Sequence, residues 1–168
     1  MLMTHTSDPS SPGADPAGTP DETTRQDTVA HQFIEALPFA HALGMRIDAL
    51  DNGRAVVSMP YDARLIGDPA TGVIHGGAVS ALIDTTAGAA VMCHPGVATT
   101  ATLDLRIDYM RPATPGQRIT AEAECYHATR NVAFVRARAV DEDTDVPVAT
   151  AAGTFTVTRG RMGQGDGS

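Results

Sequence analysis

The chain has 168 residues, a length that suits one folded domain with its own hydrophobic core. Hydrophobic residues make up 42% and charged residues 19%, an ordinary profile for a globular protein. The net charge of −8 argues against a nucleic-acid partner, because a phosphate backbone needs a basic surface. No segment approaches the roughly 20 apolar residues of a membrane span, and the N-terminus has no apolar signal core. We therefore expect a cytoplasmic protein that binds neither nucleic acid nor membrane.

The cysteines and histidines show no metal-binding pattern. Cys93 and Cys125 have neither metal-ligand nor redox-motif spacing, and His94 and His127 lack a partner at ligand spacing. We expect both thiols to be reduced and buried.

Composition divides the chain into one domain and two tails. Residues 1–28 are rich in Ser, Thr, Pro, Gly and Asp and have almost no large apolar side chain after Met3. Such a segment buries too little surface to offset the entropy of ordering it, so we expect a disordered tail. Residues 159–168 have a similar composition. The folded domain is expected over residues 29–158, without internal repeats.

The first part of the domain contains a helix and a hairpin. Residues 29–37 predict a short amphipathic helix ended by a proline, and residues 39–43 a turn. Residues 45–48 and 54–59 predict two strands, joined through Asp51-Asn52-Gly53, a strong hairpin signal.

A glycine-containing loop is expected over residues 60–74, and a long helix from Gly76 to Cys93. Strands are expected over residues 99–109, 118–126, 132–140 and 146–158, because polar and apolar residues alternate in them. In the first of these, strict alternation places Thr102, Asp104, Arg106 and Asp108 on one face and Leu103, Leu105, Ile107 and Tyr109 on the other. The predicted architecture is an α+β domain, with an antiparallel sheet of five to six strands wrapped around one long central helix.

The start of the long helix is suited to polarising a carbonyl. The first amide groups of a helix lack intrahelical partners and carry partial positive charge. Glycine at such a position lets a ligand oxygen approach the backbone. Gly76 and Gly77 can thus form an oxyanion hole, or they can simply be a glycine-rich helix entry.

Asp84 interrupts a helix that is otherwise small and apolar all round, and such a helix is expected to be buried. A carboxylate there must be paired, neutralised or used. Two interpretations stay open at this point. Asp84 is a nucleophile or general base, or it is a structural acid satisfied by Ser80 or by a neighbouring strand.

The spacing of Gly76 and Asp84 makes a prediction about assembly. Eight residues of helix rise about 12 Å, so Asp84 cannot reach a carbonyl held at Gly76 of its own chain. If both residues serve one reaction, they come from two subunits of a two-fold dimer, with sites at the interface.

Several motifs occur together in a fixed order. They are GDPATGVIHGG at residues 67–77, Asp84, TLDLRIDYMRPA at 102–113, RNVA at 130–133 and ATAAGTF at 149–155. In this combination the chain resembles the hotdog-fold acyl-CoA thioesterases of the phenylacetate-degradation type, over about residues 33–158. The resemblance implies thioester hydrolysis by homodimers, commonly paired into homotetramers, without a metal or redox cofactor.

The resemblance also implies residue roles. The Gly76 amide would polarise the thioester carbonyl, with His75 shaping the turn, and Asp84 of the other subunit would be nucleophile or general base. Thr102 matches a Ser/Thr position that helps to place the water. Asp68 stands where the family usually has asparagine, and an acid there would alter water positioning or repel carboxylated substrates. Further candidates for substrate contacts, including the phosphates or adenine of CoA, are Gly77, Arg111, Arg130 and Asn131.

Two other functions compete with hydrolysis. A hydratase or dehydratase on the same fold commonly needs an Asp-x-Asn-Pro-x-His pattern, whereas Pro69 stands six residues before His75 here. A non-catalytic acyl-CoA binding module is the second alternative.

Overall fold

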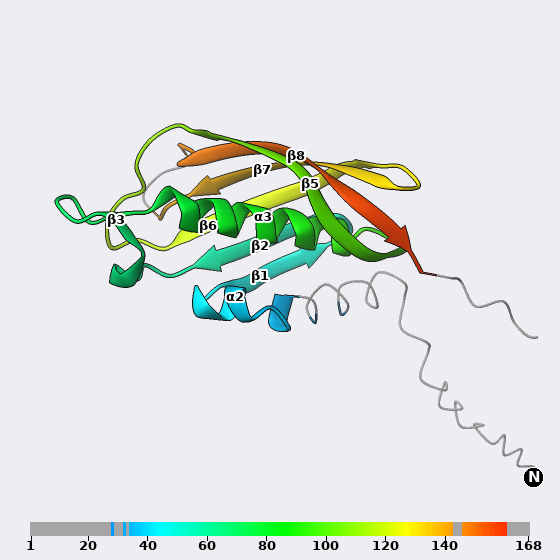
Figure 1. The fold of residues 1–168 in the computed structure, drawn as a ribbon, viewed down its shortest axis with the longest axis horizontal. Helices are drawn as coiled ribbons and strands as arrows, with labels where there is room; N and C mark the ends of the chain where they lie inside the picture. Colours follow the sequence, from blue (N-terminus) through cyan, green and yellow to red (C-terminus); the bar gives the residue numbers. More distant parts are fainter. Residues whose placement is uncertain (1–27, 29–31, 33, 143–145, 161–168) are drawn as a thin grey trace, which may run out of the picture.

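The computed structural model describes residues 28, 32, 34–142 and 146–160, and its main feature is an antiparallel sheet with one long helix along one face (Figure 1). The expected α+β architecture is therefore confirmed. The expected tails lie almost wholly outside the described residues. The last strand ends at Arg159, one residue beyond the expected domain boundary.

The main sheet has six strands in the order β1-β2-β6-β7-β8-β5, and every neighbouring pair is antiparallel. β1 and β5 are therefore its edges. The bounds of the six strands are β1 Arg46–Asp51, β2 Arg54–Met59, β5 Val97–Tyr109, β6 Ile119–Ala128, β7 Val132–Val140 and β8 Ala149–Arg159.

The β1–β2 hairpin forms where the sequence predicts it. Asn52 and Gly53 at its turn have φ of 35° and 87°. A two-residue turn of this kind needs positive φ at both positions, which Asn-Gly supplies at low cost.

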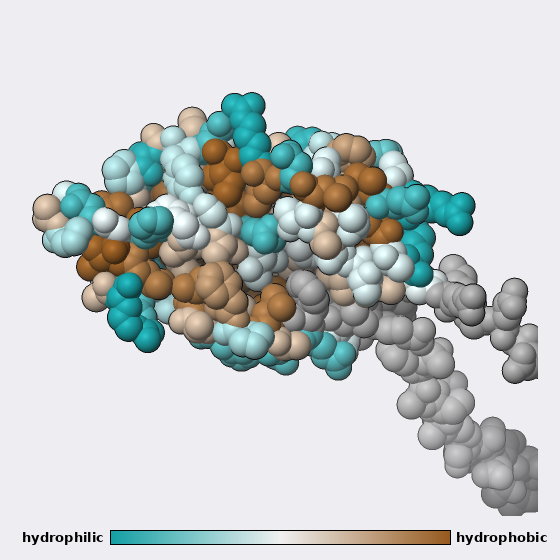
Figure 2. All heavy atoms as spheres, in the orientation of Figure 1, coloured by the Kyte–Doolittle hydropathy of each residue, from teal (hydrophilic) through white to brown (hydrophobic). Residues whose placement is uncertain are grey.

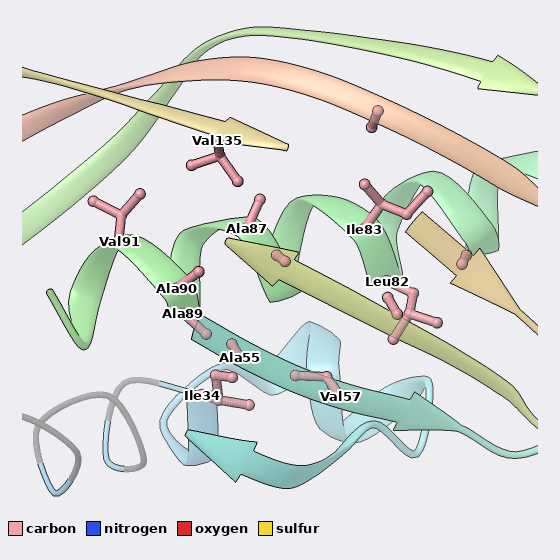
Figure 3. Packing of buried hydrophobic residues seen from close by; sticks show 14 of the residues in the cluster. Ile34, Ala55, Val57, Leu82, Ile83, Ala87, Ala89, Ala90, Val91 and Val135 are labelled. Carbon is pink, nitrogen blue, oxygen red and sulfur yellow. The ribbon is translucent and has the colours of Figure 1, made fainter. Parts of the chain in front are cut away.

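The long helix, α3, spans Gly76–Met92, close to its expected bounds. Ala87, Gly88, Ala89 and Ala90 form a buried run of small residues in α3, which allows the helix to approach the sheet closely. The helix packs against β2, β5, β6 and β7. Figure 3 shows this packing, with side chains of α3 directed at the strands that carry Val57 and Val135.

One side of the N-terminal half of α3 is open, which corrects the expectation of a helix buried all round. Gly77 is exposed, and Ala78, Ser80, Asp84 and Thr85 are only partly buried. In one chain, therefore, Asp84 faces a rim and not the core.

The connections contain more regular structure than expected. Most of the turn expected over residues 39–43 instead belongs, with Pro38, to the short helix α2 (Pro38–Ala42), because proline at a first helical position has a suitable φ. The loop expected over residues 60–74 contains the 3-10 turn η1 (Ala63–Leu65) and a two-stranded sheet of β3 (Ile66–Asp68) and β4 (Val73–Ile74). Of the helix expected over residues 29–37, the described residues 32, 34 and 35 are helical.

A β-bulge changes the face assignment of β5. Thr102 pairs with Phe155 and Asp104 with Thr154, so Leu103 is an extra residue in the ladder. A bulge reverses the alternation that follows it. The expected grouping of Thr102 with Asp104, Arg106 and Asp108 is therefore wrong, and Thr102 shares its face with Leu105, Ile107 and Tyr109.

Gly153 on β8 explains how the bulge fits. A Cβ atom added to Gly153 would lie 2.6 Å from the backbone oxygen of Asp104 and 2.9 Å from Cδ1 of Leu105. Glycine inside a strand is a known sign of a bulge or of close backbone approach. Here it indicates both.

The two cysteines are free and buried, as expected, and burial raises the pKa of the Cys125 thiol to about 11. Among the described residues, no helix is long and apolar enough to cross a membrane.

Candidate active site

Asp84 is held by the neighbouring edge strand. The Thr102 hydroxyl on β5 donates a hydrogen bond of 2.8 Å to Oδ1 of Asp84 on α3. Ser80, considered as the partner from the same helix, instead contacts Gly76 and Tyr109. The bulge at Leu103 is what turns Thr102 toward the helix.

A cavity of about 250 Å³ opens beside this pair. α3 contributes Asp84, Thr85 and Gly88 to its lining, and β5 contributes residues 100–102. Leu37 and Phe155 complete the described lining. A carboxylate, a hydroxyl and apolar side chains thus share one small hollow, a combination suited to a reacting group attached to an apolar chain.

The other end of the candidate site is the first turn of α3. His75 is the N-cap residue, and its Nδ1 accepts a hydrogen bond of 2.8 Å from the Gly77 amide. The Ala78 amide donates to the His75 carbonyl oxygen. Within the part of the chain that the structure describes, the Gly76 amide has no hydrogen-bond partner. Of the two glycine amides that were predicted to form an oxyanion hole, only the Gly76 amide is therefore available to donate to a ligand oxygen.

The Gly76 carbonyl is also held. It accepts hydrogen bonds from the Tyr109 hydroxyl at 2.6 Å and from the Ser80 hydroxyl at 3.1 Å. The two hydroxyl oxygens are themselves 2.6 Å apart. The sequence singled out Ser80 only as a partner for Asp84, and it did not single out Tyr109, although Tyr109 belongs to the 102–113 motif.

A second cavity, of about 360 Å³, lies at this end of the helix. Its described lining is Val73, Ile74, Gly76, Val79, Tyr109, Met110, Arg111, Pro112, Ala113 and Val148. The cavities at Gly76 and at Asp84 share no lining residue, as the helical rise of about 12 Å between them requires.

Arg111 has a different partner from the one expected. It forms a bidentate ion pair with Asp141, with both N···O distances 2.7 Å, and also donates to the carbonyl oxygen of Val146. The Thr114 amide donates to the same carboxylate. The Arg111 guanidinium, followed by the Thr114 amide, holds the pKa of Asp141 well below its ordinary value. This cluster ties two connections of the sheet together through the Arg111 guanidinium.

Arg130 and Asn131 lie exposed in the β6–β7 turn. The Val157 amide on β8 donates to the Asn131 carbonyl. The next residue, Val132, pairs with Thr156 on β8, which in turn pairs with Ala101 on β5. The turn therefore belongs to the Asp84 end of the molecule and not to the Gly76 end.

No three His, Cys, Asp or Glu side chains of the described residues gather as a metal site would require. The candidate site thus consists of one carboxylate, hydroxyl groups and one backbone amide.

Comparisons with known proteins address the family of the chain. A model of the thioesterase superfamily matches residues 71–148. The medium/long-chain acyl-CoA thioesterase YigI of Escherichia coli strain K12 is 28% identical over 145 residues, which cover 77% of this chain and 91% of YigI. The acyl-coenzyme A thioesterase PaaI of the same strain is 36% identical over 99 residues, which cover 58% of this chain and 67% of PaaI.

A solved structure from Pseudomonas aeruginosa is 40% identical, with a TM-score of 0.70, and covers 78% of this chain and 98% of its own. The chain belongs to the thioesterase superfamily. The structure of Escherichia coli PaaI, with a TM-score of 0.74 at 26% identity, covers 83% of this chain and 98% of PaaI, and confirms the expected hotdog fold. Thioester hydrolase is therefore the enzyme class.

In this thioesterase, Asp68 forms hydrogen bonds within the β3–β4 turn. Its carboxylate accepts hydrogen bonds from the Thr71 hydroxyl at 2.6 Å and from the Ala70 amide at 3.0 Å. These bonds, the hydroxyl first, lower the pKa of Asp68. The acid thus stays charged at neutral pH and shapes the β3–β4 hairpin that leads into His75.

Proposed function

We propose that this thioesterase hydrolyses acyl-CoA to the free acid and CoA. The observation that carries the proposal is the Asp84–Thr102 pair in the lining of a cavity that Leu37 and Phe155 also line. The names of YigI and PaaI support CoA thioesters as the substrate class.

Asp84 supplies the reactive group in this proposal. As a general base it removes a proton from the attacking water, and as a nucleophile it attacks the thioester carbonyl directly. Thr102 donates to one carboxylate oxygen and leaves the other for the reaction. The carbonyl oxygen gains negative charge as either nucleophile adds, and the Gly76 amide, helped by the positive end of α3, stabilises that charge.

Each site needs two chains. Asp84 and Gly76 line separate cavities of one chain, so a homodimer must join the Asp84 of one subunit to the Gly76 of the other. β5 is an edge strand of 13 residues, and such an edge readily pairs with another chain. Leu103 and Met110, at the bulge and just beyond the strand, are 58% and 61% exposed in one chain. In Figure 2, which has the orientation of Figure 1, apolar side chains are exposed in the region of β5.

The rest of the proposal follows from these positions. In this proposal His75 shapes the oxyanion turn, and Arg130 and Asn131 bind the anionic part of CoA at the Asp84 end. Gly77 and Asp68 act through the turn geometry that they set. The resemblance supports pairing of dimers into a homotetramer.

A substrate panel tests the proposed activity. Purified protein is incubated with short, medium, long and aryl acyl-CoAs, and released CoA thiol is measured with a thiol reagent. The protein's own thiols are buried, so they add little background. We expect turnover of at least one member of the panel. Tight binding of acyl-CoA without thiol release would identify a binding module, and loss of the conjugated thioester of an enoyl-CoA, without thiol release, would identify a hydratase.

The variant Asp84→Asn tests the assignment of the reactive group. We expect kcat to fall by about a thousandfold or more, because an amide is neither base nor nucleophile. The melting temperature and the oligomeric mass serve as controls for folding. Full activity in this variant would contradict the role of Asp84.

A further inference from the structure

Tyr109 and His75 hold opposite sides of one peptide group. The Tyr109 hydroxyl donates to the Gly76 carbonyl oxygen at 2.6 Å, and the Gly77 amide donates to His75 Nδ1 at 2.8 Å. The carbonyl and the amide belong to the same planar peptide unit, which has little freedom once both of its ends are bound. The orientation of the first turn of α3 is thereby fixed from β5 and from the N-cap.

The same two side chains leave little room for a side chain at either glycine. A Cβ atom on Gly76 would lie 3.3 Å from Cζ and from the hydroxyl oxygen of Tyr109. A Cβ atom on Gly77 would lie 2.9 Å from His75 Nδ1. The glycines therefore make room for the groups that hold them, in addition to any room they leave for a ligand.

From these contacts we infer that Tyr109 is a positioning residue for the oxyanion-binding amide. The inference rests on the proposed function and names a further residue of that same site. Tyr109 fixes the Gly76–Gly77 peptide, His75 occupies the Gly77 amide, and the Gly76 amide alone remains for the thioester oxygen. Ser80 supports the arrangement, since its hydroxyl touches both the Tyr109 hydroxyl and the Gly76 carbonyl.

A preorganised donor lowers the barrier only when it points at the place where charge develops. Removal of such a donor lowers kcat by about a hundredfold to a thousandfold in other enzymes. A donor that is present but misoriented should therefore cause a smaller loss. Because the charge appears in the transition state, the loss falls on kcat more than on KM.

The test is the variant Tyr109→Phe, which removes the hydroxyl and keeps the ring that packs on Gly76. We expect kcat to fall about tenfold, KM to change less than about twofold and the melting temperature to stay close to that of the wild type. Tyr126→Phe is the matched control, because that ring lies against Phe134 and Arg136, away from the candidate site. Wild-type kcat in Tyr109→Phe, or a loss confined to KM, would overturn the positioning role.

A second readout does not depend on activity. Without the Tyr109 hydroxyl, the Gly76–Gly77 peptide is held on one side only, so the Gly77 amide should exchange its hydrogen faster than in the wild type or in Tyr126→Phe. If the wild type releases no thiol from any acyl-CoA, but Gly77 exchange accelerates in Tyr109→Phe, the proposed function fails. The clamp, by which Tyr109 and His75 hold the Gly76–Gly77 peptide, then stands. If the wild type is active and Gly77 exchange is unchanged, the clamp fails and the proposed function stands.

Discussion

Thr102 and Tyr109 both direct their hydroxyl groups at α3, although Tyr109 follows Thr102 by seven positions on β5, an odd spacing. Thr102 donates to Asp84, and Tyr109 donates to the Gly76 carbonyl. Side chains an odd number of residues apart lie on opposite faces of a regular strand. The bulge at Leu103 removes that conflict, so one strand braces both halves of the proposed chemistry.

The bulge depends on the absence of a side chain at Gly153. In Gly153→Ala the new methyl group meets a backbone oxygen at 2.6 Å, which cannot move without displacing β5. We expect a loss of about 1–3 kcal/mol in the free energy of unfolding, typical of overpacking, and a lower kcat as Thr102 shifts. Denaturant unfolding and thiol release measure the two effects. Ala152→Ser, on the exposed side of the same strand, is the control. Unchanged stability in Gly153→Ala would argue against a fixed bulge.

The Thr102 hydroxyl itself should matter for turnover. Thr102→Val keeps the shape of the side chain and removes the donor to Asp84. The bond holds the Asp84 carboxylate in position, and misplacement of a reacting group by about 1 Å can cost about a hundredfold in rate, so we expect kcat to fall about tenfold or more with little change in KM. Thr102→Ser retains the hydroxyl and should keep most of the activity. Equal losses in the two variants would show that packing, and not the hydrogen bond, is the contribution of Thr102.

The sequence allowed the fold to be predicted where periodicity and turn chemistry are local. The Asn52-Gly53 hairpin and the small-residue helix are examples. It did not allow Thr102 to be placed correctly, because alternation assumes a regular strand. Gly153 was the available signal, but its meaning depends on the register between β8 and β5, which no local pattern contains.

The same limit applies to the candidate site. Asp84 and Gly76 stood out because a lone acid and a glycine pair are unusual in and before an apolar helix. Arg111 was a candidate for a contact with CoA, and the sequence did not reveal its ion pair with Asp141, which is 30 positions away and flanks a turn of ordinary composition. Long-range partners of this kind follow from topology, and single-sequence patterns do not report them.

The Arg111–Asp141 pair should make stability depend on acid pH. The folded pKa of Asp141 is lowered, chiefly by Arg111, whereas an unfolded aspartate has a pKa of about 3.9. A carboxyl with a lowered folded pKa stabilises the protein above its unfolded pKa, and that contribution is lost as the pH falls through the folded value. The melting temperature of the wild type should therefore drop as the pH falls below about 4.

Asp141→Asn tests this assignment by scanning calorimetry. It leaves Arg111 without its carboxylate, so we expect a loss of about 3–5 kcal/mol at neutral pH and a weaker dependence on pH below about 4. Glu142→Gln is the matched control, because its pair with Arg118 is about half exposed and contributes less than about 1 kcal/mol. Similar effects of the two substitutions would contradict a special role for Asp141.

A mixed dimer decides whether each site is shared between chains. Gly76→Pro removes the amide hydrogen at a first helical position, where proline is tolerated, and the extended backbone of His75 (ψ 133°) suits a residue before proline. Gly76→Ala brings a similar contact with Tyr109 but keeps the amide hydrogen, so it is the matched control and should retain more activity. Asp84→Asn and Gly76→Pro homodimers should both be inactive.

Co-expression with two affinity tags yields dimers that carry one chain of each variant. If Asp84 of one chain works with Gly76 of the other, one of the two sites is intact and about half of the wild-type activity returns. A mixed dimer as inactive as its parents would place both residues of a site in one chain and overturn the shared arrangement.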